Sequence, residues 1–461
     1  MAQHGAQQPT TIAAAGPGRT ATPAPPDGTL YRTIWRWHFY AGLIVLPFLL
    51  WLAITGGLYL YKPEIEGLVY RPWSTVAPAG PALPLDRLVA AVERQSGTTV
   101  AQVMRPADPR ASWRMTLVEG DGTRRLAFVD PYGGRVLGTT RNGGVMQLVR
   151  DLHSLIITGP IGNAVIEVVA GWAVLLVLTG LYLWWPRRGS PVLGLRGRPA
   201  GRLFWRDLHA SVGLVAAGVV LFLAVTGMPW TGIAGSALQG WVASHGLGRP
   251  KAPGPNPWEA AKGHDHGQMV RATLPWSLQD AAMPMAPGHG DTGPARIAAI
   301  AAAAGLSAPW TMTIPAAPGA PYVVSATIAR AEDARALYLD PAHGRVLQDA
   351  RFAGFGAGAR TIEWGIATHQ GQEYGEPNRL VMFAGCIAIA LLALTAPVLW
   401  WKRRLGGRLT APPRPPNRAS ARSVAAIMLA VGALFPLTGI SIVAALLGEA
   451  VVRRLLPAKG A

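Results

Sequence analysis

The architecture of the chain follows from residues 35–57, whose sequence is WRWHFYAGLIVLPFLLWLAITGG. From Phe39 to Tyr61 the chain carries no charged side chain and is almost wholly apolar. About 20 apolar residues are enough for a helix to cross the hydrocarbon core of a bilayer. We therefore predict a transmembrane helix from Phe39 to Tyr61.

Four further stretches have the same length and character. They are Ala164–Trp185, Ala210–Trp230, Leu380–Trp401 and Val424–Leu447. The interiors of all five lack Asp, Lys and Arg, and Glu167 is the one acidic exception. Pro47, Pro397 and Pro436 are expected to kink their helices, which membrane helices tolerate. The fold class expected is a membrane α-helical bundle of four core spans plus a fifth.

Composition supports a membrane protein. Half of the 461 residues are hydrophobic and only 14% are charged, whereas soluble domains carry about a quarter charged residues. The net charge of +18 could suggest nucleic acid, but basic residues cluster beside apolar runs, as membrane orientation requires. The expected partner is the lipid bilayer, not nucleic acid. The single cysteine, Cys386, excludes disulfides, Cys-ligated zinc and iron–sulfur clusters within one chain.

The basic clusters predict the orientation. Segments 187–206 and 402–418 are rich in Arg and Lys and have no acid, so both are expected in the cytoplasm. The long segments 62–152 and 233–377 mix both signs and are expected outside, in the periplasm of a Gram-negative cell. Residues 1–30 are expected to be a disordered cytoplasmic tail. The prediction is a multi-pass protein of a bacterial inner membrane, although the basic C-terminal tail would then lie outside, against the rule.

The chain repeats itself at fixed spacings. His38 is followed after 17 residues by Thr55-Gly56, and His209 is followed at the same offset by Thr226-Gly227. A second set is related by a shift of 216 residues, which matches His153 to His369 and Thr179 to Thr395.

The outer segments also repeat. Residues 129–137, VDPYGGRVL, parallel residues 339–347, LDPAHGRVL. Such an Asp-Pro-x-x-Gly turn between aliphatic runs is typical of a hairpin. Each half is thus predicted to contain a span, a small α+β domain, a histidine segment and another span, as an internal duplication.

Topology and repetition together bring four histidines into two pairs. His38 and His209 would meet at the cytoplasmic face, and His153 and His369 at the outer face. Each pair suits a haem bound by two histidines. Arg36 and Arg206 lie within one helical turn of the inner histidines and could bind the haem propionates. Weaker candidates outside are Arg150 and Arg360.

Other interpretations of these histidines exist. A lone histidine at a helix end is usually an interfacial residue, and only the matching of four favours ligation. Two histidines leave a zinc or copper shell incomplete, whereas haem supplies four nitrogens itself. The glycine run Gly354–Gly358 lacks the strand–helix frame and the acidic partner of a dinucleotide site. No flavin or nicotinamide site is visible, so an electron donor must be separate.

The duplicated layout resembles the PepSY-associated transmembrane family and, within it, the ferric-siderophore reductases. The resemblance covers about residues 31–405 and rests on Trp35-Arg36-x-His38, Asp151-Leu152-His153, Leu208-His209 and Thr368-His369. It implies two b-type haems and two periplasmic PepSY domains. The implied activity is reduction of the Fe(III) of a siderophore or another chelate, with electrons from a cytoplasmic reductase or membrane quinol.

A Gly/Pro-rich insertion, residues 233–293, leaves an alternative open. It contains His264, His266, Met283, Met285 and His289, which are candidate copper ligands because thioether suits Cu(I) and imidazole suits Cu(II). A flexible loop with incidental polar residues is the other interpretation. A copper reductase or copper-handling protein, and a non-enzymatic sensor or scaffold with PepSY modules, are therefore the two alternative functions.

These features set the expected boundaries. They are 1–30 for the tail, 31–62 for the first span, 63–145 for the first PepSY-like domain, 146–186 for the outer histidine segment and second span, 187–207 for a basic loop, 208–232 for the third span, 233–293 for the insertion, 294–355 for the second PepSY-like domain, 356–402 for the second histidine segment and fourth span, 403–421 for a basic loop, 422–448 for the fifth span and 449–461 for the C-terminal tail.

Overall fold

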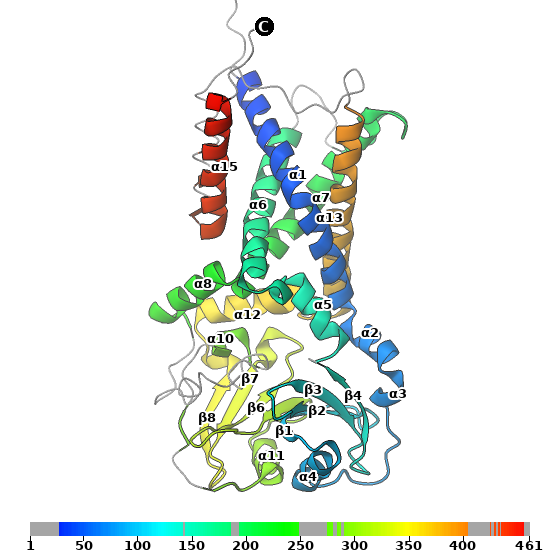
Figure 1. The fold of residues 1–461 in the computed structure, drawn as a ribbon, viewed down its shortest axis with the longest axis vertical. Coiled ribbons are helices and arrows are strands. Elements are labelled where there is room, and N and C mark those ends of the chain that lie inside the picture. Colours follow the sequence, from blue (N-terminus) through cyan, green and yellow to red (C-terminus); the bar gives the residue numbers. More distant parts are fainter. Residues whose placement is uncertain are drawn as a thin grey trace, which may run out of the picture.

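The computed structural model describes residues 27–141, 143–185, 193–248, 274–279, 284–286, 290–403, 425, 428, 429, 432, 433 and 435–455. Figure 1 shows long helices at one end, a β-sheet at the other, and short helices between them.

Four long apolar helices form the bundle. They are α1 (Asp27–Leu60), α6 (Pro160–Trp184), α7 (Arg202–Gly227) and α13 (Glu376–Trp401). In the described residues, these are the helices long and apolar enough to cross a membrane. They match the first four predicted spans. However, α1 and α7 begin before the apolar stretches do, because the helical hydrogen bonding continues through the basic segment. His38 and His209 therefore lie inside helices and not at their starts.

The four helices are arranged as a closed ring. Helix α1 packs against α6 and α13, and α7 packs against the same two helices. Helices α1 and α7 thus stand at opposite corners of the bundle, as do α6 and α13. Pro47 and Pro397 lie within α1 and α13 as expected.

The outer segments form one antiparallel sheet. Its order is β4-β3-β2-β1-β5-β6-β7-β8. The first four strands are β1 (Thr99–Arg105), β2 (Trp113–Val118), β3 (Arg124–Val129) and β4 (Val136–Arg141); the others are β5 (Trp310–Thr313), β6 (Tyr322–Ala326), β7 (Arg335–Leu339) and β8 (Val346–Arg351). The prediction of two separate small domains is wrong in this respect, because β1 pairs with β5. Gln102 Nε2 donates to Thr313 Oγ1 at 3.0 Å across this junction.

Two helices cover the sheet face that lies away from the bundle (Figure 1). They are α4 (Leu85–Ser96) and α11 (Pro294–Ala303). Leu88, Met115, Ile297 and Met312, all fully buried, belong to the core between these helices and both halves of the sheet. The shared core explains why the two segments fold as one domain, since burying apolar surface is the main favourable term in folding.

The repeated Asp-Pro segments are hairpins, as predicted. They connect β3 to β4 and β7 to β8. The backbone N–H of Gly134 donates to the carbonyl of Asp130, and that of Gly344 to Asp340. Both glycines have a φ of 70°, a left-handed conformation that glycine adopts without steric cost.

Short helices make up the rest of the described helical structure, and most of them lie between the sheet and the bundle (Figure 1). They are α2 (Lys62–Val69), α3 (Arg71–Ser74), α5 (Val145–His153), η1 (Ile156–Thr158), η2 (Met228–Trp230), α8 (Ile233–Ser244), α10 (Trp276–Gln279), η3 (Ala331–Asp333), η4 (Phe352–Gly354) and α12 (Ala357–His369). Two of them, α5 and α12, end on a histidine and lead into α6 and α13. Both histidines are thereby held at the junction of the bundle and the sheet domain.

Glu167, the one acid within the predicted spans, is fully buried. Its Oε2 accepts the backbone N–H groups of Ile233 at 3.1 Å and Ala234 at 3.0 Å. The start of a helix favours a negative side chain, because its first N–H groups have no partner within the helix. Glu167 therefore fixes α8 against α6.

The fifth span differs from its prediction. The described helix is α15 (Pro436–Leu455), and Pro436 begins it and does not kink it. The Oγ1 of Thr438 approaches the Val168 carbonyl, near the outer end of α6. From there α15 runs back to the end of the bundle where α1 begins (Figure 1). Met428 packs in the same cluster as Ile442. Helix α15 therefore runs from the level of the sheet domain toward the start of α1, which is opposite to the direction predicted for the fifth span.

Candidate functional site

Four histidines lie at two levels of the bundle. His38 is in α1 and His209 in α7, which occupy opposite corners. His153 and His369 end α5 and α12 at the other level. The structure therefore places one histidine of each half at each level of the bundle.

Every histidine is hydrogen-bonded to a threonine of a neighbouring helix. The distances from Nδ1 to Oγ1 are 2.9 Å for His38–Thr179, 2.9 Å for His153–Thr55, 2.8 Å for His209–Thr395 and 2.8 Å for His369–Thr226. The bonds run in both directions between neighbouring helices. Helix α1 carries His38, which bonds to Thr179 of α6, and it also carries Thr55, which bonds to the histidine just before α6. Helices α7 and α13 are related in the same way. Antiparallel packing explains this pattern: the start of one helix lies beside the end of the next.

The threonine hydroxyls determine which imidazole nitrogen carries the proton. Each hydroxyl lies within hydrogen-bond distance of a backbone carbonyl in its own helix: Thr55 with Trp51 at 2.7 Å, Thr179 with Leu175 at 2.6 Å, Thr226 with Phe222 at 2.6 Å and Thr395 with Leu392 at 3.2 Å. A hydroxyl that donates its proton there can only accept from the histidine. Nδ1 is therefore protonated, and Nε2 keeps the lone pair that a metal ion requires.

Glycines make room for three of the rings. A Cβ at Gly56 would lie 3.2 Å from Cε1 of His153, and one at Gly180 would lie 3.3 Å from Cε1 of His38. At Gly227 the same distance to His369 is 3.6 Å. Each glycine directly follows the threonine that binds the same histidine. The fourth threonine, Thr395, is followed by Ala396 and departs from this pattern.

The outer histidines are neutral at physiological pH. Burial lowers the pKa of His153 to about 4. Burial, and then the charge of His153, lower the pKa of His369 to about 3. A neutral imidazole is the form that binds metal ions. The edge of the Trp230 ring also packs on His369, with centroids 5.9 Å apart.

The predicted propionate-binding arginines have different surroundings. Arg206 donates from Nη2 to Asp207 at 2.8 Å, and Asp207 also binds Arg196. Arg206 is thus paired with a carboxylate, a contact that the sequence pattern did not predict. The guanidinium of Arg36 lies 5.1 Å from the centre of the Tyr40 ring. On the outer side, Arg150 lies 4.0 Å from Asp151, and Arg360 is exposed.

Two buried polar atoms at these levels have no partner in the described structure. They are Trp400 Nε1 and Thr368 Oγ1. Trp400 packs on Phe39, next to His38, and Thr368 precedes His369. Buried polar groups normally find hydrogen-bond partners. One unsatisfied group beside each pair fits a bound cofactor with polar substituents, as haem has.

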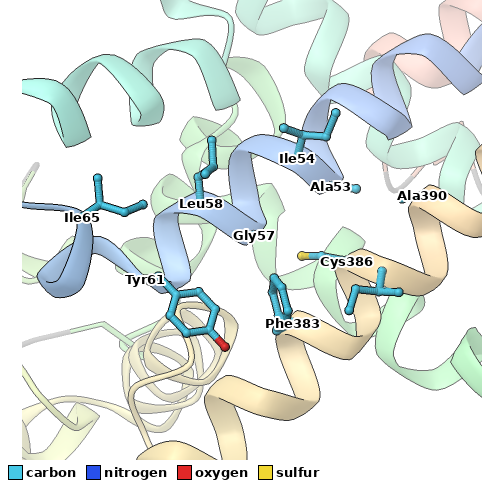
Figure 2. Close-up of a pocket in the computed structure, with 10 residues that line it drawn as sticks. Ala53, Ile54, Gly57, Leu58, Tyr61, Ile65, Phe383, Cys386 and Ala390 are labelled. Atoms are coloured by element: carbon cyan, nitrogen blue, oxygen red, sulfur yellow. The ribbon is translucent and has the colours of Figure 1, made fainter. Parts of the chain in front are cut away.

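An apolar groove lies behind the outer pair, between α1 and α13 (Figure 2). Its volume is about 420 Å³, and Gly57, Phe383 and Cys386 are among the residues that line it. A Cβ at the neighbouring Gly56 would lie 3.7 Å from the sulfur of Cys386. Apart from the Cys386 thiol and the Tyr61 hydroxyl the lining is apolar, so the groove offers mainly hydrophobic contact.

The predicted copper ligands are mostly outside the described residues, namely His264, His266, Met283 and His289. Met285 is described and is 48% exposed. A Cβ at Gly319 would lie 3.7 Å from its methyl group. Within the described ranges, no group of three or more His, Cys, Asp or Glu side chains is arranged to hold a metal ion.

The threonine partners were the part of the site that sequence reasoning missed. The Thr-Gly pairs were identified only as markers of the repeat. Their role could have been inferred from their depth in the membrane. Each threonine lies near the end of a span, and the neighbouring antiparallel span has a histidine at the same depth.

Comparison with known proteins gives one family. No curated protein matches the chain. The model of the PepSY-associated TM region matches residues 35–403, which include all four histidines and the whole sheet domain. The chain therefore belongs to the PepSY-associated transmembrane family.

Proposed function

We propose that this membrane protein binds two haem groups and carries electrons across the bilayer to a ferric chelate on the side of the sheet domain. The observation that supports this most is the set of four histidines whose Nδ1 atoms are fixed by threonines. A ring nitrogen fixed in this way orients the other nitrogen for metal binding and raises its basicity.

Haem is favoured over a bare metal ion by the number of ligands. Each level offers two histidines, and in the described residues no His, Cys, Asp or Glu completes a group of three that could hold a metal ion. Zinc and copper sites need three or four protein ligands, whereas haem iron needs only two beyond its own four nitrogens. When bound, each haem would supply reversible one-electron chemistry.

The chain's own residues would set the properties of each cofactor. The histidines would ligate the iron, and Thr55, Thr179, Thr226 and Thr395 would orient them. Glycines would let the rings approach the helix backbone. Apolar side chains of the bundle would exclude water, which tunes the potential of a buried centre. Arg36 and Trp400 are the proposed polar contacts at the inner level, and Thr368 is the one at the outer level.

Electron transfer across the bilayer needs two cofactors because of the distance between the two histidine levels. Along α1, His38 and Thr55 are 17 residues apart, which corresponds to about 25 Å at 1.5 Å per residue. We infer that the His38/His209 level faces the cytoplasm of a bacterial inner membrane, because Arg202, Arg206 and Lys402 lie at that end. A cytoplasmic reductase or a membrane quinol is the proposed donor. The proposed acceptor, a ferric siderophore or similar chelate, follows from the family resemblance.

Removal of one ligand tests the pairing. Purified His209→Ala protein is expected to contain one haem per chain instead of two, because the inner pair loses an axial ligand. Haem is quantified as its pyridine complex. The matched control is His245→Ala, which changes an exposed histidine outside both pairs and should leave two haems. Retention of two haems in His209→Ala would refute the pairing.

A further inference from the structure

A cation and two aromatic rings gather beside the outer pair. Arg360 and Trp364 lie one turn apart on α12, and both are exposed. The indole N–H of Trp364 donates to the hydroxyl of Tyr374 at 2.9 Å. Trp364 is 38% exposed and Tyr374 is 61% exposed. Trp364 and Tyr374 each lie five residues from His369 in the chain, and Arg360 lies nine residues before it. We refer to Arg360, Trp364 and Tyr374 as the aromatic patch.

The aromatic patch contacts the outer pair through α7. The Trp364 ring packs on Phe222 with centroids 5.9 Å apart. The carbonyl of Phe222 accepts the hydroxyl of Thr226, and the same hydroxyl binds His369. Only Phe222 and Thr226 therefore lie between the exposed Trp364 and His369, a proposed haem ligand, along this path of contacts. A molecule bound at the patch would be near the outer cofactor.

The fold itself does not require these residues. The positions 216 residues earlier are occupied by Gly144, Leu148 and Thr158, although α5 ends on His153 just as α12 ends on His369. The first copy builds the same helix, histidine and following span without them. A ring of interfacial aromatic residues is common in membrane proteins, but it does not explain a combination of Arg, Trp and Tyr found in one copy alone.

The neighbouring acids are engaged elsewhere. Glu363 is buried and accepts the backbone N–H of Ser277 at 2.7 Å. Glu373 accepts the N–H of Ala331 at 2.8 Å. Glu376 binds Arg379. The exposed side chains of the patch thus offer a positive charge and two aromatic faces, which is complementary to a flat anionic ligand.

We propose that the aromatic patch is the docking site of the electron acceptor, and that this acceptor is an anionic ferric chelate with flat aromatic iron-binding groups. This inference rests on the proposed function and names the substrate class. Aromatic groups of the chelate stack on Trp364 and Tyr374, and Arg360 offsets its negative charge. A reduced haem held by His153 and His369 would supply the one electron that converts the chelated Fe(III) to Fe(II).

Binding of a redox-inert analogue tests the docking site. The probe is the Ga(III) complex of 2,3-dihydroxybenzoate, which has the charge and shape of the ferric complex but accepts no electron. Its affinity for the full-length protein is measured by equilibrium dialysis. The variant Trp364→Leu/Tyr374→Thr carries the residues that the first copy has, and it should bind at least about tenfold more weakly, since two aromatic contacts are lost. Arg360→Gly should also weaken binding.

Controls separate this inference from the proposed function. Trp185→Leu removes a tryptophan that is 66% exposed at the other end of the bundle, and it should bind the gallium complex like the unaltered protein. Ga(III) citrate, which has no aromatic group, should bind weakly to all variants. Equal affinity of the double variant and the unaltered protein, or no binding by either, overturns the docking site. Haem content, measured on the same samples, tests the proposed function independently.

Discussion

Threonine has the same role at all four histidines. Its hydroxyl donates to a carbonyl of its own helix and accepts from an imidazole of the next helix. A residue that hydrogen-bonds to a metal-binding histidine typically contributes about 10–100-fold to metal affinity. The threonine hydroxyl is therefore expected to matter almost as much as the ligand it orients.

Thr226→Val tests this role. Valine has nearly the shape of threonine but lacks the hydroxyl, so Nδ1 of His369 loses its acceptor. Haem affinity at the outer site is expected to fall about 10–100-fold, with a shifted midpoint potential, both followed by spectroscopic titration. Thr226→Ser keeps the hydroxyl and should restore both values. The control is Thr361→Val, whose hydroxyl bonds only to the carbonyl of Ala357. Unchanged affinity in Thr226→Val would show that the threonine is only structural.

At the level of helices, α12 contains a buried carboxyl. Burial raises the pKa of Glu363 above its usual value. The native state then binds more protons than the unfolded chain, so stability falls as the pH rises from the unfolded pKa through the native one. Glu363→Gln is expected to raise the melting temperature at pH 8 and to have little effect at pH 4, where the carboxyl is protonated. Thermal unfolding at both pH values checks this. Equal effects at both would contradict it.

The contact between α6 and α15 depends on a glycine. A Cβ at Gly171 would lie 2.1 Å from Thr438 Oγ1, which forces the helices apart. Gly171→Ala is expected to destabilise the protein by about 1–3 kcal/mol, measured by thermal unfolding. Thr438→Ala in the same chain should recover part of the loss. Gly218→Ala is the control, since no atom of the described structure lies within 4 Å of that Cβ; a similar loss there would contradict the packing argument.

The sequence predicted helices and hairpins more accurately than their assembly. The first four spans are long runs of apolar residues, and the hairpins have turn residues at fixed positions, so both carry local signals. Pairing of β1 with β5 has no local signal, because it joins residues more than 200 positions apart, as Gln102 and Thr313 show. The histidines could be paired from the predicted topology of the spans. Their threonine partners could not be identified in this way, because that needs knowledge of how the helices pack.

On the scale of the whole molecule, the C-terminal helix changes the predicted topology. Because α15 runs toward the end of the bundle where α1 begins, residues 453 and 454 lie at the same end as Arg206 and Lys402. This placement agrees with the cytoplasmic orientation that we propose for that end. Hydropathy alone could not reveal it, since the direction of a helix leaves no trace in its apolar character.

Reporter fusions test this topology. A reporter fused after residue 461 should lie on the same side of the membrane as one fused before residue 1. A reporter inserted at Gly120, in the turn between β2 and β3, should lie on the opposite side. Alkaline phosphatase and green fluorescent protein give opposite signals for the two sides. A C-terminal reporter on the side of Gly120 would show that the last segment crosses the membrane.

The most direct test of the central claim is the absorption spectrum of the purified, full-length protein. After expression with sufficient haem and reduction by dithionite, we expect b-type bands and two haems per chain, because the four threonine-bound histidines form two pairs of proposed ligands. A colourless protein under the same conditions would contradict the account, and would leave the four threonine-bound histidines without a cofactor to ligate.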